Sequence, residues 1–340
     1  MAEIRDTTPG KTSTDKIRSM VRWILEVSLQ EPVKLYRLCD ELYQQLSALV
    51  RLDPDSDSQR SNKALHSGTA IGTTWAAMCI KDLVRPKKFV DGVYQAVKQK
   101  LDTSPGLPLH IVYAGTGPFA TLALPLFFSF SDKEIQFSMI EVNEESFTAM
   151  KETVRLLDAS GYIRRYIQDD AAFLKMPGEK TDILICETIQ RALKKEPQVS
   201  ILLNLVPQLD DEFTLIPEEI RLDAAISNPQ MRMRMKQGLA VEDHFKKLKN
   251  ILILNKNGIR DAYKNGFREV ELNVSASLLE QYPELQIHSH IRVFGDIEIR
   301  HDESAITLPE PIKRSGKKGN LSGIFKYRLN EEPGMVFTER

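Results

Sequence analysis

The 340-residue sequence has little cysteine and no long hydrophobic run, and both absences narrow the class of protein. Its three cysteines, Cys39, Cys79 and Cys186, are too widely spaced to suggest a disulfide framework or a cysteine zinc site. The longest apolar stretch, residues 119–130, is too short to span a bilayer, and residues 1–16 lack the apolar core of a secretory signal. We therefore expect a cytoplasmic protein without a membrane partner.

The sequence also lacks an excess of charge of one sign. Lys and Arg number 46 and Asp and Glu number 47, which leaves a net charge of -1 and no global positive field to attract nucleic acid. The six histidines show no spacing typical of a metal site, so we expect no bound metal. Hydrophobic residues at 42% and charged residues at 27% are ordinary values for a folded chain, and the length favours two domains.

The pattern of apolar residues changes along the chain and predicts four regions. We expect a disordered tail at 1–14 and a helical region at 15–100, where apolar residues recur at three-and-four spacing. Residues 101–217 alternate β-rich runs with helical segments, which predicts an α/β fold with a Rossmann-like parallel sheet. Residues 218–340 contain short alternating strands, which predict an antiparallel, barrel-like domain with a helical arm at about 229–263.

A glycine-rich turn follows the first strand predicted in the α/β region, residues 110–114. The residues of this turn are Ala114, Gly115, Thr116 and Gly117. The turn precedes a helix predicted over 119–128, and glycine in that position lets a ligand approach the backbone at the strand end. The alternative is a tight strand-to-helix turn that binds nothing.

Acidic residues end the next two predicted strands. Glu141 lies 24 residues after Gly117, where an acid that accepts the ribose hydroxyls of a nucleoside is expected. Asp170 and Ala171 end the third strand, where an adenine amine would find an acceptor. NAD and S-adenosylmethionine (SAM) would both use such residues, but the bulky Pro-Phe pair that begins at Pro118 narrows the opening that a pyrophosphate needs. The pattern favours an adenosyl ligand without a pyrophosphate, although a solvated strand-end acid is the alternative for Glu141.

Two glutamates flank a segment that can loop out after the fourth predicted strand. Glu187 directly follows the apolar run DILIC, and Glu196 comes nine residues later. Two carboxylates that converge on one pocket repel unless a cation lies between them, and a guanidinium offers a planar fork of donors that pairs with carboxylates. The alternative for Glu196 is a solvated surface acid beside Lys194 and Lys195.

At these residues the chain resembles the protein arginine methyltransferases. Cys186-Glu187 with Glu196 nine positions on resembles the double-E loop of that family, and AGTGPF at 114–119 resembles the glycine motif of its symmetric-dimethylating subgroup. Leu215-Ile216-Pro217 resembles the segment that precedes the family's barrel. The resemblance covers residues 70–220 well and the barrel loosely.

The resemblance implies a divergent, SAM-dependent N-methyltransferase that acts on arginine, free or within a peptide or protein, and releases S-adenosylhomocysteine. Glu187 and Glu196 would hold the guanidinium, Glu141 would bind the ribose, and Arg85 would bind the methionine carboxylate of SAM. The family also suggests a homodimer. Two alternatives stay open, namely SAM-dependent methylation of another small-molecule amine or hydroxyl, and a catalytically silent partner subunit with the SAM fold.

Overall fold

The computed structural model describes residues 11–103, 108–239, 243–314 and 319–340. It divides the chain into two compact units. Unit 1 comprises residues 1–63, 71–170 and 180–185, and unit 2 comprises residues 64–70, 171–179 and 186–340. Residues 186–217, which we expected in the Rossmann-like region, belong to unit 2 in this division. No helix in the described part of the chain combines the length and the apolar character that a membrane span requires.

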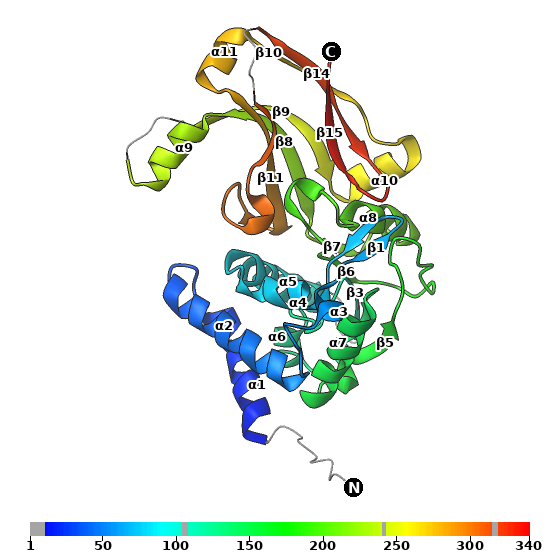
Figure 1. Ribbon diagram of the computed structural model, residues 1–340. Helices are drawn as coiled ribbons and strands as arrows, with labels where there is room; N and C mark the ends of the chain where they lie inside the picture. The colour runs from blue at the N-terminus through cyan, green and yellow to red at the C-terminus, as the bar shows by residue number, and fades with distance from the viewer. Residues whose placement is uncertain (1–10, 104–107, 240–242, 315–318) are drawn as a thin grey trace. The chain divides into compact units, whose positions relative to one another are not determined.

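Two amphipathic helices open unit 1 (Figure 1). α1 spans Lys11–Glu26 and α2 spans Pro32–Leu49, so the first part of the region predicted over 15–100 is helical, as expected. Proline fits the first turn of α2 because the N–H it lacks would have no partner inside the helix. α1 begins within the predicted disordered tail, of which residues 1–10 lie outside the described residues.

Further helices and a hairpin follow before the parallel sheet. They are α3 (Asp57–Arg60), β1 (Lys63–Leu65), β2 (Gly68–Ala70), α4 (Thr73–Met78), η1 (Cys79–Lys81) and α5 (Val84–Thr103). Within the predicted helical region we expected a break near Arg85-Pro86, but the break lies just before Val84, so Pro86 falls in the first turn of α5, where proline is tolerated.

The sheet of unit 1 confirms the predicted α/β core. Four strands of this five-stranded sheet are β3 (Leu109–Ala114), β4 (Ile135–Ile140), β5 (Ile163–Ile167) and β6 (Ile183–Cys186). They neighbour one another in the order β5-β4-β3-β6, and both the β3–β4 and the β4–β5 pairs are parallel. Every residue of β3 and β6 is buried, as expected for strands covered on both faces. Between these strands lie α7 (Glu144–Leu156) and η2 (Ser160–Tyr162).

The helix predicted over 119–128 is largely absent. Only Leu124–Phe127 forms a helical turn, α6. The preceding residues form turns, and Ala120 has a φ of 48°, in the left-handed region that ends regular helices. Most residues of 119–128 are apolar because they are buried in turns, and not because they form a helix.

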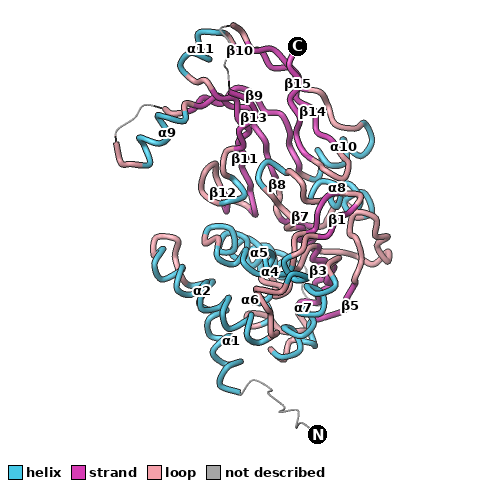
Figure 2. The backbone as a smooth tube through the Cα atoms, viewed as in Figure 1, coloured by secondary structure: helices cyan, strands magenta, loops and turns pink. Residues whose placement is uncertain are grey.

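Two antiparallel sheets dominate unit 2 and confirm the predicted antiparallel domain (Figure 2). The first has the order β12-β11-β8-β9, with β13 paired to β11, and the second has the order β10-β14-β15. The strands are β8 (Glu219–Ser227), β9 (Phe245–Leu254), β10 (Val270–Val274), β11 (Glu284–Phe294), β12 (Ile297–Ile299), β13 (Glu310–Arg314), β14 (Leu321–Arg328) and β15 (Gly334–Glu339). The remaining elements of this unit are η3 (Arg191–Leu193), α8 (Gln198–Leu205), η4 (Val206–Gln208), β7 (Thr214–Ile216), α9 (Pro229–Lys236), α10 (Lys256–Asn265), α11 (Ala276–Gln281) and η5 (Ala305–Thr307).

The helical arm predicted at about 229–263 is only partly helical. α9 and α10 are helices, but residues 245–254 between them form strand β9. β9 pairs with β8 from Phe245 to Leu254, and this ladder satisfies its backbone groups better than an isolated helix would. Pairing with β8 therefore makes the sequence FKKLKNILIL a strand, and a search for helical periodicity does not reveal this pairing.

Candidate functional site

In unit 1, β3 ends at Ala114 and leads into the glycine turn. Gly115 has a φ of 77° and Gly117 a φ of 60°, in the left-handed region that glycine adopts without strain. Thr116 between them is buried, and its Oγ1 has no hydrogen-bond partner. Buried polar atoms normally have a hydrogen-bond partner, so a polar atom of a ligand that binds at this strand end would supply the partner that Thr116 Oγ1 lacks.

The structure brings Glu141 to this turn. Its Oε2 accepts a hydrogen bond of 2.8 Å from the N–H of Gly117, and its Oε1 accepts one of 2.9 Å from the N–H of Asn143. The side chain is buried, and burial raises the pKa of Glu141 above its ordinary value, although the two N–H donors act in the opposite direction. Each carboxylate oxygen keeps a further lone pair for a ligand hydroxyl.

A polar network that the sequence analysis missed holds Glu141 in place. Asn143 Oδ1 caps α7 by accepting from the N–H groups of Glu145 and Ser146, at 3.0 and 3.2 Å. The hydroxyl of Thr73, the first residue of α4, donates to the same oxygen at 3.2 Å and accepts from the Ser146 hydroxyl at 3.0 Å. The N-terminal ends of α4 and α7 therefore meet beside Glu141. The sequence NEES at 143–146 is typical of a helix N-cap, but it does not indicate that Thr73 is a hydrogen-bond partner.

The other predicted cofactor residues lie on other segments of the chain. Arg85 lies in the first turn of α5 and is half-buried. β5 ends at Ile167, so the expectation that Asp170 and Ala171 end this strand is wrong. Asp170 is half-buried three residues later, and its N–H donates to Asp169 Oδ1 at 2.8 Å. Ala171, the next residue, is buried and belongs to unit 2, where its carbonyl accepts from Asn204 Nδ2 at 2.9 Å.

Unit 2 carries both predicted glutamates on one loop, residues 187–197, which we name the glutamate loop. The side chain of Gln198 closes the base of this loop. Its Oε1 accepts from the N–H and the hydroxyl of Thr188, both at 2.9 Å, and its Nε2 donates to the carbonyl of Cys186 at 2.9 Å. Cys186 is fully buried, and burial raises the pKa of its thiol, which disfavours the reactive thiolate form.

The tip of the glutamate loop has an unusual backbone held by contacts within unit 2. Ala192, Leu193 and Lys195 have φ values of 55°, 54° and 64°. The Tyr327 hydroxyl donates to the carbonyl of Leu193 at 2.7 Å, and the N–H of Lys195 donates to the carbonyl of Pro333 at 2.9 Å. Residues held in sparsely populated conformations persist only where their surroundings fix them, and they concentrate at functional sites.

Strand β2 of the N-terminal hairpin also contacts the tip of the glutamate loop. The N–H of Thr69 donates to the carbonyl of Lys195 at 2.7 Å. A side chain at Gly68 would place its Cβ 2.4 Å from that carbonyl oxygen, so only glycine permits this approach. β2 therefore acts as a support for the loop although it lies more than 100 residues earlier in the sequence.

The two glutamates differ in exposure. Glu196 is only 8% exposed, so the alternative reading as a solvated surface acid is wrong. Glu187 is half-buried directly after β6. Carboxylates partly shielded from water interact more strongly with a cation than exposed ones do. Among the described residues, no cluster of His, Cys, Asp and Glu side chains could hold a metal ion.

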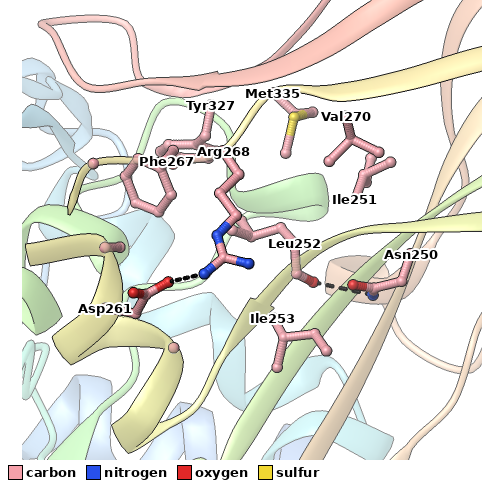
Figure 3. Close-up of a pocket in the computed structure, with 13 residues that line it drawn as sticks. Asn250, Ile251, Leu252, Ile253, Asp261, Phe267, Arg268, Val270, Tyr327 and Met335 are labelled. Atoms are coloured by element: carbon pink, nitrogen blue, oxygen red, sulfur yellow. Dashed lines mark hydrogen bonds and ion pairs between the residues drawn. The ribbon is translucent and has the colours of Figure 1, made fainter.

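A hollow of about 270 Å³ lies elsewhere in unit 2, between β9, α10 and β10 (Figure 3). Its apolar lining includes Ile251 and Met335, and Arg268 pairs with Asp261 at 3.0 Å at its side. None of the predicted site residues lines it. Tyr327 belongs both to this lining and to the support of the glutamate loop.

The comparisons with known proteins bear on the fold. No family model and no curated protein matches the sequence. Among solved structures, the chain is similar to one from the PRMT1 enzyme-prozyme heterotetrameric complex of Trypanosoma brucei with AdoHcy. The TM-score is 0.53 at 10% sequence identity, and the match covers 77% of this chain and 95% of the other. The chain therefore has the fold of this PRMT in divergent form, a Rossmann-like core joined to an antiparallel β domain.

Proposed function

We propose that the protein is a SAM-dependent N-methyltransferase that acts on the guanidino group of arginine, free or within a peptide or protein. The observation that carries the proposal is the glutamate loop, in which Gln198 fixes the base and Glu196 is buried. Glu187 directly follows β6, the strand next to β3, and β3 leads into the glycine turn. The similarity to a PRMT1 complex with AdoHcy supports the SAM part of the proposal.

The residues of unit 1 fit an adenosyl ligand. The orphaned hydroxyl of Thr116 would gain a partner, and Glu141 would accept hydrogen bonds from the ribose. We propose that Arg85 pairs with the methionine carboxylate and that Asp170 accepts from the adenine amine. The complete proposed cofactor set is Arg85, Ala114, Gly115, Thr116, Gly117, Glu141, Asp170 and Ala171. SAM, when bound, supplies an electrophilic methyl group.

The glutamates would act by electrostatics and positioning. Glu187 and Glu196 hold the guanidinium and draw its positive charge toward the nitrogens that do not react. The attacking nitrogen then keeps more lone-pair character, and holding it in line with the methyl group replaces a bimolecular encounter with an oriented one. The proton of the methylated nitrogen leaves late, to a carboxylate or to water, so neither glutamate has to be a strong base.

Substitution of the first glutamate tests this function. We expect Glu187→Gln to lower kcat/KM for arginine substrates at least about 100-fold, because an amide cannot neutralise the guanidinium. Transfer is measured with isotope-labelled SAM on free arginine, arginine-containing peptides and a metabolite extract, with mass spectrometry of the product. SAM affinity, measured by calorimetry, should stay near that of the unsubstituted protein.

The control for this experiment is Glu269→Gln, which removes an exposed glutamate paired with Lys326 in the same unit. It should leave transfer unchanged. Unimpaired transfer by Glu187→Gln would reject the role of the glutamate, and transfer only to another amine or hydroxyl would reject arginine as the acceptor. SAM binding without turnover on any substrate would favour a silent partner subunit. We also propose a homodimer, which sedimentation of the purified chain tests.

A further inference from the structure

The glutamate loop carries cations as well as acids, and one buried carboxylate binds two of them. Arg191 Nε lies 3.0 Å from Glu310 Oε2, and Lys194 Nζ lies 2.5 Å from Glu310 Oε1. The Glu310 side chain is 10% exposed, whereas those of Arg191 and Lys194 are 43% and 39% exposed. Glu310 is the first residue of β13 and lies more than 100 residues after the loop in the sequence.

These cations are potential competitors of an arginine substrate. Arg191 carries the same planar guanidinium as the proposed acceptor and lies four residues from Glu187 and five from Glu196. A group tethered this closely reaches an effective concentration of about millimolar or more at a neighbouring site. A substrate of ordinary affinity would then have to displace the side chain of the protein itself.

Glu310 offers these cations a different partner. The backbone contacts of the loop tip, from Tyr327 and to Pro333, fix its path but neutralise no charge. We propose that Glu310 is a positioning residue that holds Arg191 and Lys194 away from the two glutamates of the loop. This inference rests on the proposed function. It predicts that the charge of Glu310, rather than its shape, determines how well arginine competes for the site.

A substitution series separates this role from a merely structural one. We expect Glu310→Gln to raise KM for the arginine substrate by about 10-fold with a smaller effect on kcat, because the released cations compete with ground-state binding. The triple variant Glu310→Gln, Arg191→Gln, Lys194→Gln removes the competitors as well as their partner, and it should return KM to within about threefold of the original value. An unchanged KM in the single variant, or a triple variant as impaired as the single one, would overturn the proposal.

A second readout needs no turnover. A carbodiimide joins a lysine amine to a carboxylate in direct contact, and peptide mass spectrometry identifies the linked residues. The unsubstituted protein should give a Lys194–Glu310 link, and Glu310→Gln should give a link from Lys194 to Glu187 or Glu196 instead. The exposed pair Lys326 and Glu269, 2.9 Å apart, is the internal control and should link in both proteins.

The two readouts distinguish failure of the inference from failure of the proposed function. If the cross-link moves but no substrate is methylated, the proposed function fails and the role of Glu310 in holding the cations stands. If arginine is methylated but neither KM nor the cross-link responds to Glu310→Gln, the inference fails and the function stands.

Discussion

Gln198 organises the glutamate loop more directly than either glutamate does. It is 1% exposed, and its amide bonds both to the residue before Glu187 and to the residue after it. Both ends of the amide are used, so the side chain fixes where the loop leaves β6 and where α8 begins. A buried amide with complete partners is costly to replace because each partner left behind loses its hydrogen bond.

We therefore predict that Gln198→Leu disrupts the loop. The substitution leaves the N–H of Thr188 and the carbonyl of Cys186 without their partner, which should cost about 1–3 kcal/mol in the free energy of unfolding. Methyl transfer should fall at the same time, whereas SAM affinity should not. Urea unfolding and the transfer assay measure the two effects. Gln230→Leu, at an exposed position on α9, is the matched control, and equal stability of the two variants would contradict the prediction.

The sequence predicts some residues of the candidate site and misses others. The spacing between Gly117 and Glu141 follows from a βαβ unit, and the structure confirms their contact. The burial of Glu196 was not predictable from the two lysines that precede it. Gln198, Thr73 and Glu310 were missed because the sequence near each of them does not identify its hydrogen-bond or ion-pair partner.

At the level of elements, local pattern located the strands of the parallel sheet better than those of unit 2. β3, β4 and β6 lie within two residues of the runs 110–114, 135–141 and 181–187 that the sequence predicts as strands, since a strand buried on both faces is mostly apolar. β9 and β10 escaped prediction because each has exposed polar residues and takes its conformation from a neighbouring strand. Whether such a segment forms a strand depends on its pairing with a distant segment, and local periodicity does not show that pairing.

An aromatic and histidine cluster joins β9, β11 and the turn after β12. The rings of His288 and His301 stack with centroids 3.7 Å apart, and Phe245 packs against both. Burial lowers the pKa of His288 to about 2 and that of His301 to about 4. The positive charges of nearby His244 and Arg232 act in the same direction on both pKa values, and that of His301 adds to the effect on His288. Asp302 opposes this for His301. The folded unit therefore requires these imidazoles to be neutral.

This cluster predicts a loss of stability in acid. Because the folded-state pKa of His288 lies below its unfolded value near 6.5, its stabilisation is complete above about pH 6.5 and falls as the pH drops toward the folded value, by at most about 1.4 kcal/mol per pH unit. Urea unfolding between pH 7 and pH 4.5 measures the slope. His288→Phe keeps the ring stack and should reduce the slope to the part that His301 contributes. His66→Phe, at an exposed position, should not, and equal slopes in both variants would refute the role of the cluster.

At the scale of the whole molecule, the chain passes between the two units repeatedly. It changes unit at residues 63, 70, 170, 179 and 185. The sequence predicts consecutive regions because the pattern of apolar residues changes stepwise along the chain, whereas contacts between distant segments determine where the chain crosses from one unit to the other. The hairpin strand β2 belongs to unit 2, for example, because Thr69 bonds to Lys195. Neither unit is a continuous segment that could be excised.

This connectivity predicts one cooperative unfolding transition for the chain. Trp23 and Trp75 both lie in unit 1, so tryptophan fluorescence reports on that unit alone, and hydrogen exchange of β8, β11 and β14 reports on unit 2. S-adenosylhomocysteine at 100 times its Kd should stabilise the folded chain by about 2.7 kcal/mol. We expect both probes to show this increase, although the proposed ligand residues lie almost entirely in unit 1. A shift seen by fluorescence without protection in the strands of unit 2 would show that the units unfold independently, whereas no shift in either probe would reject the proposed cofactor.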